Sequence, residues 1–200
     1  MKHGHSCWRA RPSQRNTLLS WIFTLLLTVG CSFVFPPGAA HAAVFASRQE
    51  AIQAVLPDAE RIETRTITLT EEQLQQIATL ATAQVDSKLL SVAIGYKGDI
   101  VIGYAFFDTR PVRTLPGTFL VSVSPTGTVQ KVMVVAFHEP EDYLPPQRWL
   151  QQFDGKVLAP ELQVYKGIHA ISGATLSSQS VTNAVRKASA AFQIVFHGGH

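Results

Sequence analysis

The chain has 200 residues, of which 46% are hydrophobic, and this suffices for the core of one domain of ordinary size. Its formal charge of +3 comes from the first fifteen positions, because residues 43–200 carry 13 basic against 14 acidic side chains, a balance that argues against nucleic-acid binding. Cys7 and Cys31 both lie before residue 43, so the rest of the chain can hold neither a disulfide nor a thiolate-bound metal, cluster or haem.

The first 42 residues have the layout of an export segment. Four basic residues precede the apolar run Leu18–Phe35, and Ala40-His41-Ala42 supplies a small-x-small cleavage site. The sequence therefore predicts a signal peptide over residues 1–42, cleaved after Ala42, with the remainder exported across the cytoplasmic membrane. Because the apolar run approaches the length that spans a bilayer, an uncleaved membrane anchor is the alternative. A lipoprotein site at Cys31 fits less well than either.

Residues 43–88 are predicted to form a helix, a strand and a second helix. In the helices expected over 47–55 and 70–82, a Ser or Thr is followed three residues later by Glu or Gln, which is the spacing of a capping box. The segment between them, 61–69, is rich in β-branched residues and is predicted to be a strand.

Residues 89–200 are predicted to contain two β-hairpins followed by helices. The first hairpin joins strands around Lys97-Gly98-Asp99, and the second turns at Pro125-Thr126-Gly127. A Pro-rich loop then leads to a short helix over 146–153, and a last helix is expected over 180–196. Successive hairpins give an antiparallel sheet, so we predict an α+β fold with flanking helices and a single domain after the export segment.

The segment before the last helix, "HAISGATLSSQS", is rich in hydroxyl side chains. Taken by itself it is explained by helix capping, with Ser177, Ser178 and Ser180 as candidate N-caps. The same stretch also suits a phosphate group, because the N–H groups and dipole of a helix N-terminus favour an anion, and Gly173 lets the backbone approach it. It lacks the G-K-[ST] of a Walker A loop, which argues against a nucleoside triphosphate.

"ISGATLSS" resembles the flavinylation motif of the FMN-binding domains found in Rnf-type complexes, sodium-pumping quinone reductases and regulators of denitrification. The motif of that family runs D-x-x-[ST]-G-A-T-x-[ST]-S. The segments "GDIVIGYAFF", "VVAFHEP" and "WLQQFDGK" follow the order of the family as well, so the resemblance covers about Leu89–Phe196 and marks 89–200 as the FMN-binding domain. It implies that a separate flavin transferase transfers FMN from FAD, with magnesium, to the Thr175 hydroxyl as a phosphoester.

The resemblance also implies which residues lie at the cofactor. His138 and Glu139 correspond to positions near the flavin ring. An equally good interpretation is that they are a polar surface pair at the end of a strand, with no role at the cofactor. The residues implied to surround the phosphate are Ser172, Gly173, Ala174, Thr175, Ser177 and Ser178.

On this interpretation the exported domain is an electron carrier, and no catalytic residue and no metal site are expected in it. It would relay electrons to or from a membrane-bound redox protein of haem or quinone type. The alternative is a flavin-free sensing or assembly module of the same fold. That alternative stays open because His169 occupies the position where the family has an acidic residue.

Other aromatic and histidine residues are weaker candidates. Tyr104 and Trp149 could stack on the flavin, but at strand and helix positions they are more typical of a core. Tyr165 and Lys166 could line the phosphate or ribityl chain. His197 and His200 near the C-terminus could bind a metal ion, but no carboxylate lies beside them in the sequence, so we expect both side chains to be exposed to solvent. No G-x-S-x-G or S-x-x-K motif supports a hydrolase.

Overall fold

The computed structural model describes residues 43–85 and 87–197, which belong to one compact unit, Ala40–His200. The predicted export segment and His200 lie outside the described residues. Within these two ranges no helix is both long enough and apolar enough to cross a membrane.

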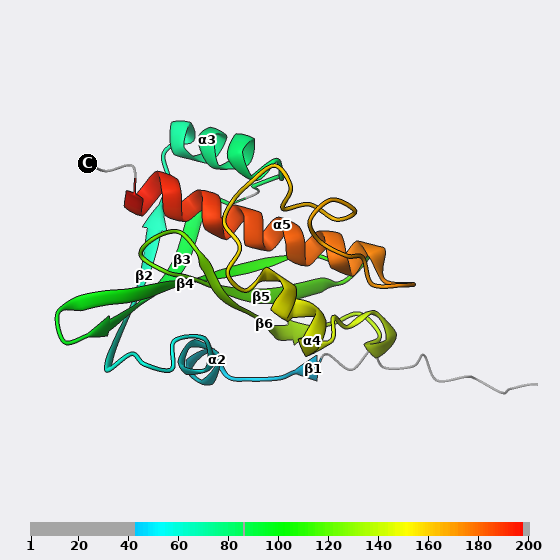
Figure 1. Cartoon of the computed structure of the whole chain (residues 1–200), viewed down its shortest axis with the longest axis horizontal. Coiled ribbons are helices and arrows are strands. Elements are labelled where there is room, and N and C mark those ends of the chain that lie inside the picture. The colour runs from blue at the N-terminus through cyan, green and yellow to red at the C-terminus, as the bar shows by residue number, and fades with distance from the viewer. Residues whose placement is uncertain (1–42, 86, 198–200) are drawn as a thin grey trace, which may run out of the picture. The chain divides into compact units, whose positions relative to one another are not determined.

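The centre of the fold is an antiparallel sheet of six strands in the order β1-β6-β5-β4-β3-β2 (Figure 1). Both predicted hairpins are confirmed: β3 pairs with β4 and β5 pairs with β6. Each turn contains a glycine with positive φ, Gly98 at +57° and Gly127 at +86°, a conformation that glycine adopts without steric cost. The strands are β1 Ala43–Val44, β2 Arg61–Thr68, β3 Leu89–Lys97, β4 Ile100–Pro111, β5 Pro116–Val123 and β6 Val129–Phe137.

Helices cover both faces of the sheet, as the α+β prediction requires. Helices α5 and α3 lie over one face and α2 lies over the other (Figure 1). Successive side chains along a strand point to opposite faces of the sheet, so each face has its own core. Val92 packs in the core beneath α5, whereas its neighbour Ala93 packs against α2. The helical segments are α2 Arg48–Val55, α3 Glu71–Ala81, η1 Glu141–Tyr143, α4 Gln147–Leu150, η2 Gln151–Phe153, α5 Thr175–Phe192 and η3 Gln193–His197.

Both capping boxes are present. The Ser47 hydroxyl accepts from the Glu50 N–H while the Glu50 carboxylate accepts from the Ser47 N–H, and Thr70 and Gln73 repeat this arrangement at α3. The first helices therefore begin where local side-chain hydrogen bonds satisfy their free N–H groups.

Arg186, on α5, is buried and has no carboxylate partner among the described side chains. Its guanidinium instead donates to the last carbonyls of α3 and to the loop after η2, and so ties α5 to two segments that are distant in sequence. The acceptors are Leu80 O at 3.1 Å, Ala81 O at 2.6 Å, Thr82 Oγ1 at 2.7 Å, Ala159 O at 2.8 Å and Leu162 O at 3.1 Å. Because the carbonyl end of a helix carries partial negative charge, a cation is stabilised there.

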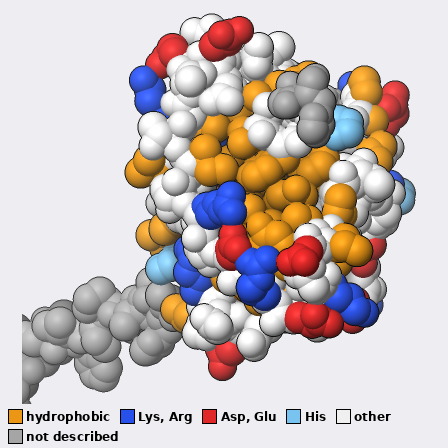
Figure 2. Space-filling model, turned by 90° about the vertical axis from the view of Figure 1, so that its left-hand side faces the viewer, with side chains coloured by type: hydrophobic (Ala, Val, Ile, Leu, Met, Phe, Trp, Pro, Cys, Tyr) orange, Lys and Arg blue, Asp and Glu red, His pale blue; other side chains and the backbone are white. Residues whose placement is uncertain are grey.

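Hydrophobic side chains gather on the surface at the end of the molecule where α5 finishes, on the left of Figure 1 (Figure 2). At that end of the helix Tyr104 packs on Phe192 and Phe196, with ring centroids 5.3 and 4.6 Å apart. Tyr104 is therefore a packing residue at the end of α5 opposite to Thr175. His197 lies there too and stacks on Phe192.

Candidate functional site

The hydroxyl-rich motif forms the start of α5, at its orange end in Figure 1. Gly173 has φ +78°, in the left-handed region that favours glycine. Ala174 is the buried N-cap, and Thr175 is the first residue of the helix, with a half-buried side chain. The predicted start of this helix at residue 180 was therefore wrong, because the helix takes in the second half of the motif.

The capping interpretation was also wrong. Ser177, Ser178 and Ser180 all lie inside α5, and the Ala174 side chain at the N-cap makes no hydrogen bond. Ser178 Oγ instead accepts from the Ile171 N–H at 2.9 Å and contacts Ala174 O at 3.2 Å, bracing the loop from within the helix. The first N–H groups of α5 consequently have no side-chain acceptor from an N-cap, although such groups need one.

Ser177 adds a second polar group without a partner at the same end of α5. Its hydroxyl is buried, and among the described residues no hydrogen-bond partner reaches its Oγ. A buried unpaired hydroxyl is costly, and this one lies in the first turn of the helix, two residues from Thr175. The N–H groups at the start of α5 fit a phosphate attached to Thr175, whereas the Ser177 hydroxyl, like that of Ser189 farther along the helix, is buried without a partner within the described ranges.

The segment before the motif is held by backbone contacts to α4 and η2. The Trp149 indole N–H donates to His169 O at 2.7 Å, and the His169 N–H donates to Gln152 Oε1 at 2.9 Å. Trp149 also packs edge-on against Phe153. His169 thus has its backbone fixed on both sides while its side chain is exposed, so the position where the family carries an acid faces solvent.

The structure brings the Tyr165 side chain beside the Thr175 hydroxyl. Its hydroxyl lies 3.4 Å from Thr175 Oγ1, although the two residues are ten positions apart. Lys166, beside it, is exposed. The structure therefore places Tyr165 at the motif, as the sequence suggested.

His138 and Glu139 lie at the junction of β6 with the β4–β5 loop. The buried Glu139 carboxylate accepts from three successive N–H groups, those of Arg113 at 3.0 Å, Thr114 at 2.7 Å and Leu115 at 2.8 Å. His138 Nδ1 lies 3.1 Å from Pro116 O. Burial by itself would raise the pKa of the Glu139 carboxyl, but the three N–H donors and the Arg113 charge bring it below its ordinary value.

This loop belongs to the same end of the sheet as the motif, since Ser180 Oγ of α5 donates to Pro111 O at 3.2 Å. The contacts of Glu139 organise the loop, and any contact with a flavin stays a prediction.

Replacing Glu139 with Gln is expected to lower the free energy of unfolding at pH 7 by about 1–2 kcal/mol, because a neutral amide accepts the three N–H bonds more weakly. The pKa of Glu139 is lowered in the folded state, so its contribution is present above its ordinary value of 4.5 and is lost as the pH falls through the folded-state pKa. Urea unfolding of wild type and variant should therefore converge at acid pH. Glu141→Gln, an exposed carboxylate in η1, is the control, and equal pH profiles for all three proteins would contradict this role.

A buried ion cluster fixes α5 to β4. Asp108 is buried and lies 2.6 Å from Lys187 Nζ, with Arg110 as its second partner. Burial opposes ionisation, but the two cations hold the pKa of Asp108 below its usual value. The cluster carries one net positive charge beneath the helix that begins with Thr175.

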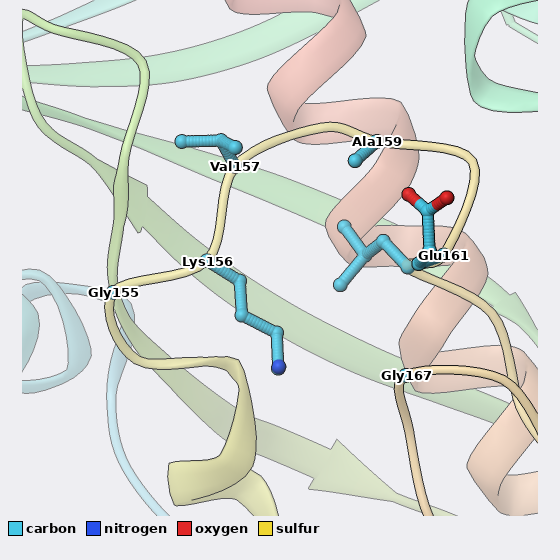
Figure 3. Close-up of a pocket in the computed structure, with 7 residues that line it drawn as sticks. Gly155, Lys156, Val157, Ala159, Glu161 and Gly167 are labelled. Carbon is cyan, nitrogen blue, oxygen red and sulfur yellow. The ribbon is translucent and has the colours of Figure 1, made fainter.

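One shallow hollow lies near the motif end of α5, and a second lies farther from the motif, beside the loop after η2. The first, of about 270 Å³, runs along α5 past Leu176 and Gln179 and is closed by Arg110 on β4. The other, of about 260 Å³, lies between the loop after η2 and the turn before the motif, and in Figure 3 the side chains of Lys156 and Glu161 point apart at its edges. Both are smaller than the pockets that enclose a drug-sized ligand. A group as large as FMN would therefore stay partly exposed on this surface.

No group of three or more His, Cys, Asp or Glu side chains within the described ranges could hold a metal ion. The motif itself presents hydroxyls and helix N–H groups around one half-buried threonine.

Comparison with known proteins finds a family model and a relative that are similar to this chain. Residues 115–190, from the start of β5 to near the end of α5, match the model of the FMN-binding domain. This part of the chain is therefore similar to FMN-binding domains. The chain is also similar to one component of the Na(+)-translocating ferredoxin:NAD(+) oxidoreductase complex of Acetobacterium woodii, at 28% identity over 153 residues, which cover 70% of this chain and 72% of that component.

The matched region begins at the β4–β5 loop held by Glu139 and includes Tyr165, the motif and Arg186. Helix α3 and strands β2–β4 lie before it, yet they complete the sheet and the core of the same unit. Sequence reasoning missed two residues that hold the motif, Gln152 and Ser178 as a brace, and it missed Arg186, which fixes α5 to α3 and to the loop after η2. Of these residues, only Arg186 could have been found from the sequence, because it is a basic residue in the apolar half of a predicted helix.

Proposed function

We propose that this protein is an exported flavoprotein that carries FMN on Thr175 through a phosphoester and relays electrons with a membrane-bound redox partner. The observation that supports it is the start of α5 within the FMN-binding domain. There the N-cap makes no side-chain hydrogen bond, the Ser177 hydroxyl has no partner among the described residues, and Thr175 offers a half-buried hydroxyl.

The residues present fit the phosphate of FMN. The first N–H groups of α5 would donate to it with the helix dipole behind them, and Gly173 leaves open space for the backbone to approach. The flavin itself supplies electron transfer when bound, and the protein supplies its position and surroundings.

A covalent bond suits a protein that works outside the cytoplasm. A cofactor bound reversibly is lost when its free concentration falls below the dissociation constant, whereas a phosphoester is independent of that concentration. The export segment over residues 1–42 and the motif are thus two parts of one interpretation. A flavin transferase that uses FAD and magnesium would install the group.

The partner is proposed from the comparison. The Acetobacterium woodii relative belongs to a Na(+)-translocating ferredoxin:NAD(+) oxidoreductase complex, so it works beside other redox components. By analogy, the present chain would exchange electrons with a membrane redox protein of haem or quinone type. It would do so either tethered to the membrane by its N-terminal segment or released from it after cleavage.

A flavin-free module is the second candidate, and His169 is the observation that favours it. Its side chain is exposed, where a modifying enzyme would meet a histidine in place of an acid. If the acid is needed for recognition, the same fold would stay unmodified.

The deciding experiment is the intact mass of the full chain co-expressed with a flavin transferase, beside a culture without the transferase. We expect the mass of one FMN less one water, with flavin absorbance that persists after denaturation, only when the transferase is present. A wild-type chain without an adduct, together with a labelled His169→Asp chain, would reject the carrier and favour the flavin-free module.

A further inference from the structure

Tyr165 has a backbone conformation that its residue type disfavours. Among the described non-glycine residues only Thr82 and Tyr165 have positive φ, at +49° and +69°. The positive φ of Thr82 is explained by its position as the C-cap of α3, where left-handed residues are common, and its hydroxyl accepts a hydrogen bond from Arg186. Tyr165 ends no helix, and a left-handed conformation is strained for a bulky residue because its Cβ crowds the backbone.

The turn around Tyr165 enforces this conformation. The Tyr165 N–H donates to Ile168 O at 2.9 Å, and the Gly167 N–H donates to Glu161 O at 2.8 Å. A Cβ at position 167 would lie 2.5 Å from Glu161 O, so only glycine fits there. Figure 3 shows Gly167 across the small hollow from Lys156. The strain at Tyr165 is therefore imposed by a closely built turn.

Burial of the ring does not offset this strain. Tyr165 is 73% exposed, so its ring gains little from removal from water. What the conformation achieves is the contact between the tyrosine hydroxyl and Thr175 Oγ1 at 3.4 Å. Strain that is maintained without a gain in packing is typical of residues that act at a functional site.

We propose that Tyr165 positions the Thr175 hydroxyl for flavin attachment and afterwards donates its O–H to the attached phosphate. This inference rests on the proposed function. In the attachment step Thr175 Oγ forms a bond to the flavin-side phosphorus of FAD, the bond from that phosphorus to AMP breaks, and the threonine proton is released to a base. The products are the phosphoester and AMP, with no change of oxidation state and no consumption of the tyrosine.

The chemistry of the two states explains why one hydroxyl serves both. Before attachment Tyr165 and Thr175 can each donate to the other, which restricts the rotation of the acceptor hydroxyl. After attachment the threonine oxygen carries no proton, and the negatively charged phosphate oxygens are stronger acceptors. The tyrosine O–H then has a single preferred partner.

The test compares Tyr165→Phe, which keeps the ring, with Tyr165→Asn, which tolerates the left-handed backbone but lacks the phenol. Tyr96→Phe is the matched control, because its hydroxyl contacts Glu63 in another part of the sheet. The full chain is incubated with transferase, FAD and magnesium, and the adduct is followed by intact mass. Separate kcat and KM values for the acceptor chain, the unfolding temperature and the ³¹P resonance of the attached phosphate are recorded.

We expect both Tyr165 variants to be labelled about tenfold more slowly, through kcat, as fits the loss of one hydrogen bond to the acceptor hydroxyl. The unfolding temperature of Tyr165→Phe should equal that of wild type while its ³¹P resonance shifts. Labelling of Tyr165→Phe at the wild-type rate, or an equal loss in Tyr96→Phe, would overturn the proposal. A wild-type chain that takes up no FMN would overturn the proposed function, and this inference with it.

Discussion

Replacing Thr175 with Ala is expected to abolish covalent FMN attachment completely. The methyl group has no oxygen to form the phosphoester, and no other described hydroxyl occupies the first position of α5. Because the Thr175 side chain is only half-buried, the free energy of unfolding should change by no more than about 0.5 kcal/mol. Intact mass after co-expression with the transferase measures the first effect, and urea unfolding measures the second.

Two neighbouring substitutions sharpen that result. Thr175→Ser keeps a hydroxyl on the same carbon and is expected to be labelled. Ser172→Ala removes an exposed hydroxyl implied to lie beside the phosphate, and it should slow labelling without moving the site of attachment. An adduct on the Thr175→Ala chain that disappears when Ser172 is also removed would move the attachment site out of the helix. It would then contradict the role given to the helix N–H groups.

Replacing Arg186 with Met is expected to lower the free energy of unfolding by about 3–4 kcal/mol. The side chain keeps most of its volume but loses all five hydrogen bonds, which leaves buried carbonyls at the end of α3 and in the loop after η2 without donors. Arg186→Lys should recover only part of the loss, because one ammonium cannot reach acceptors on two separate segments. The midpoint of urea unfolding measures both.

Arg148→Met, an exposed arginine on α4, is the control and should fall within about 0.5 kcal/mol of wild type. A loss of less than about 1 kcal/mol in Arg186→Met would show that water replaces the guanidinium, and that α3 is not fixed to the FMN-binding domain through this residue. Flavin attachment at low temperature should survive the substitution, because Arg186 lies several turns from Thr175 along α5.

Local patterns in the sequence determined much of the architecture. The capping boxes at Ser47 and Thr70 fixed the starts of two helices through side-chain hydrogen bonds within four residues. The glycines at 98 and 127 fixed the hairpin turns through their freedom at positive φ. The motif around Thr175 pointed to the family whose model matches residues 115–190, since it is a contiguous run of residue types.

The start of α5 and the roles of its serines were decided by tertiary contacts. A Ser before a helix is a cap by local propensity, but Ser177 and Ser178 lie in the first turn, because the loop before them is fixed from outside by Trp149 and Gln152. Glu139 was ambiguous in sequence because its three N–H donors come from residues 24 to 26 positions away.

The sequence by itself thus determined the strands from β2 to β6 and the hairpin turns, because each depends on neighbours within a few positions. The export segment and Thr175 as the attachment site stay predictions. The tertiary structure alone decided which groups surround that threonine. The strained Tyr165 and the buried Arg186 make contacts to residues 10 to 106 positions away, and no periodicity of side chains records contacts at such separations.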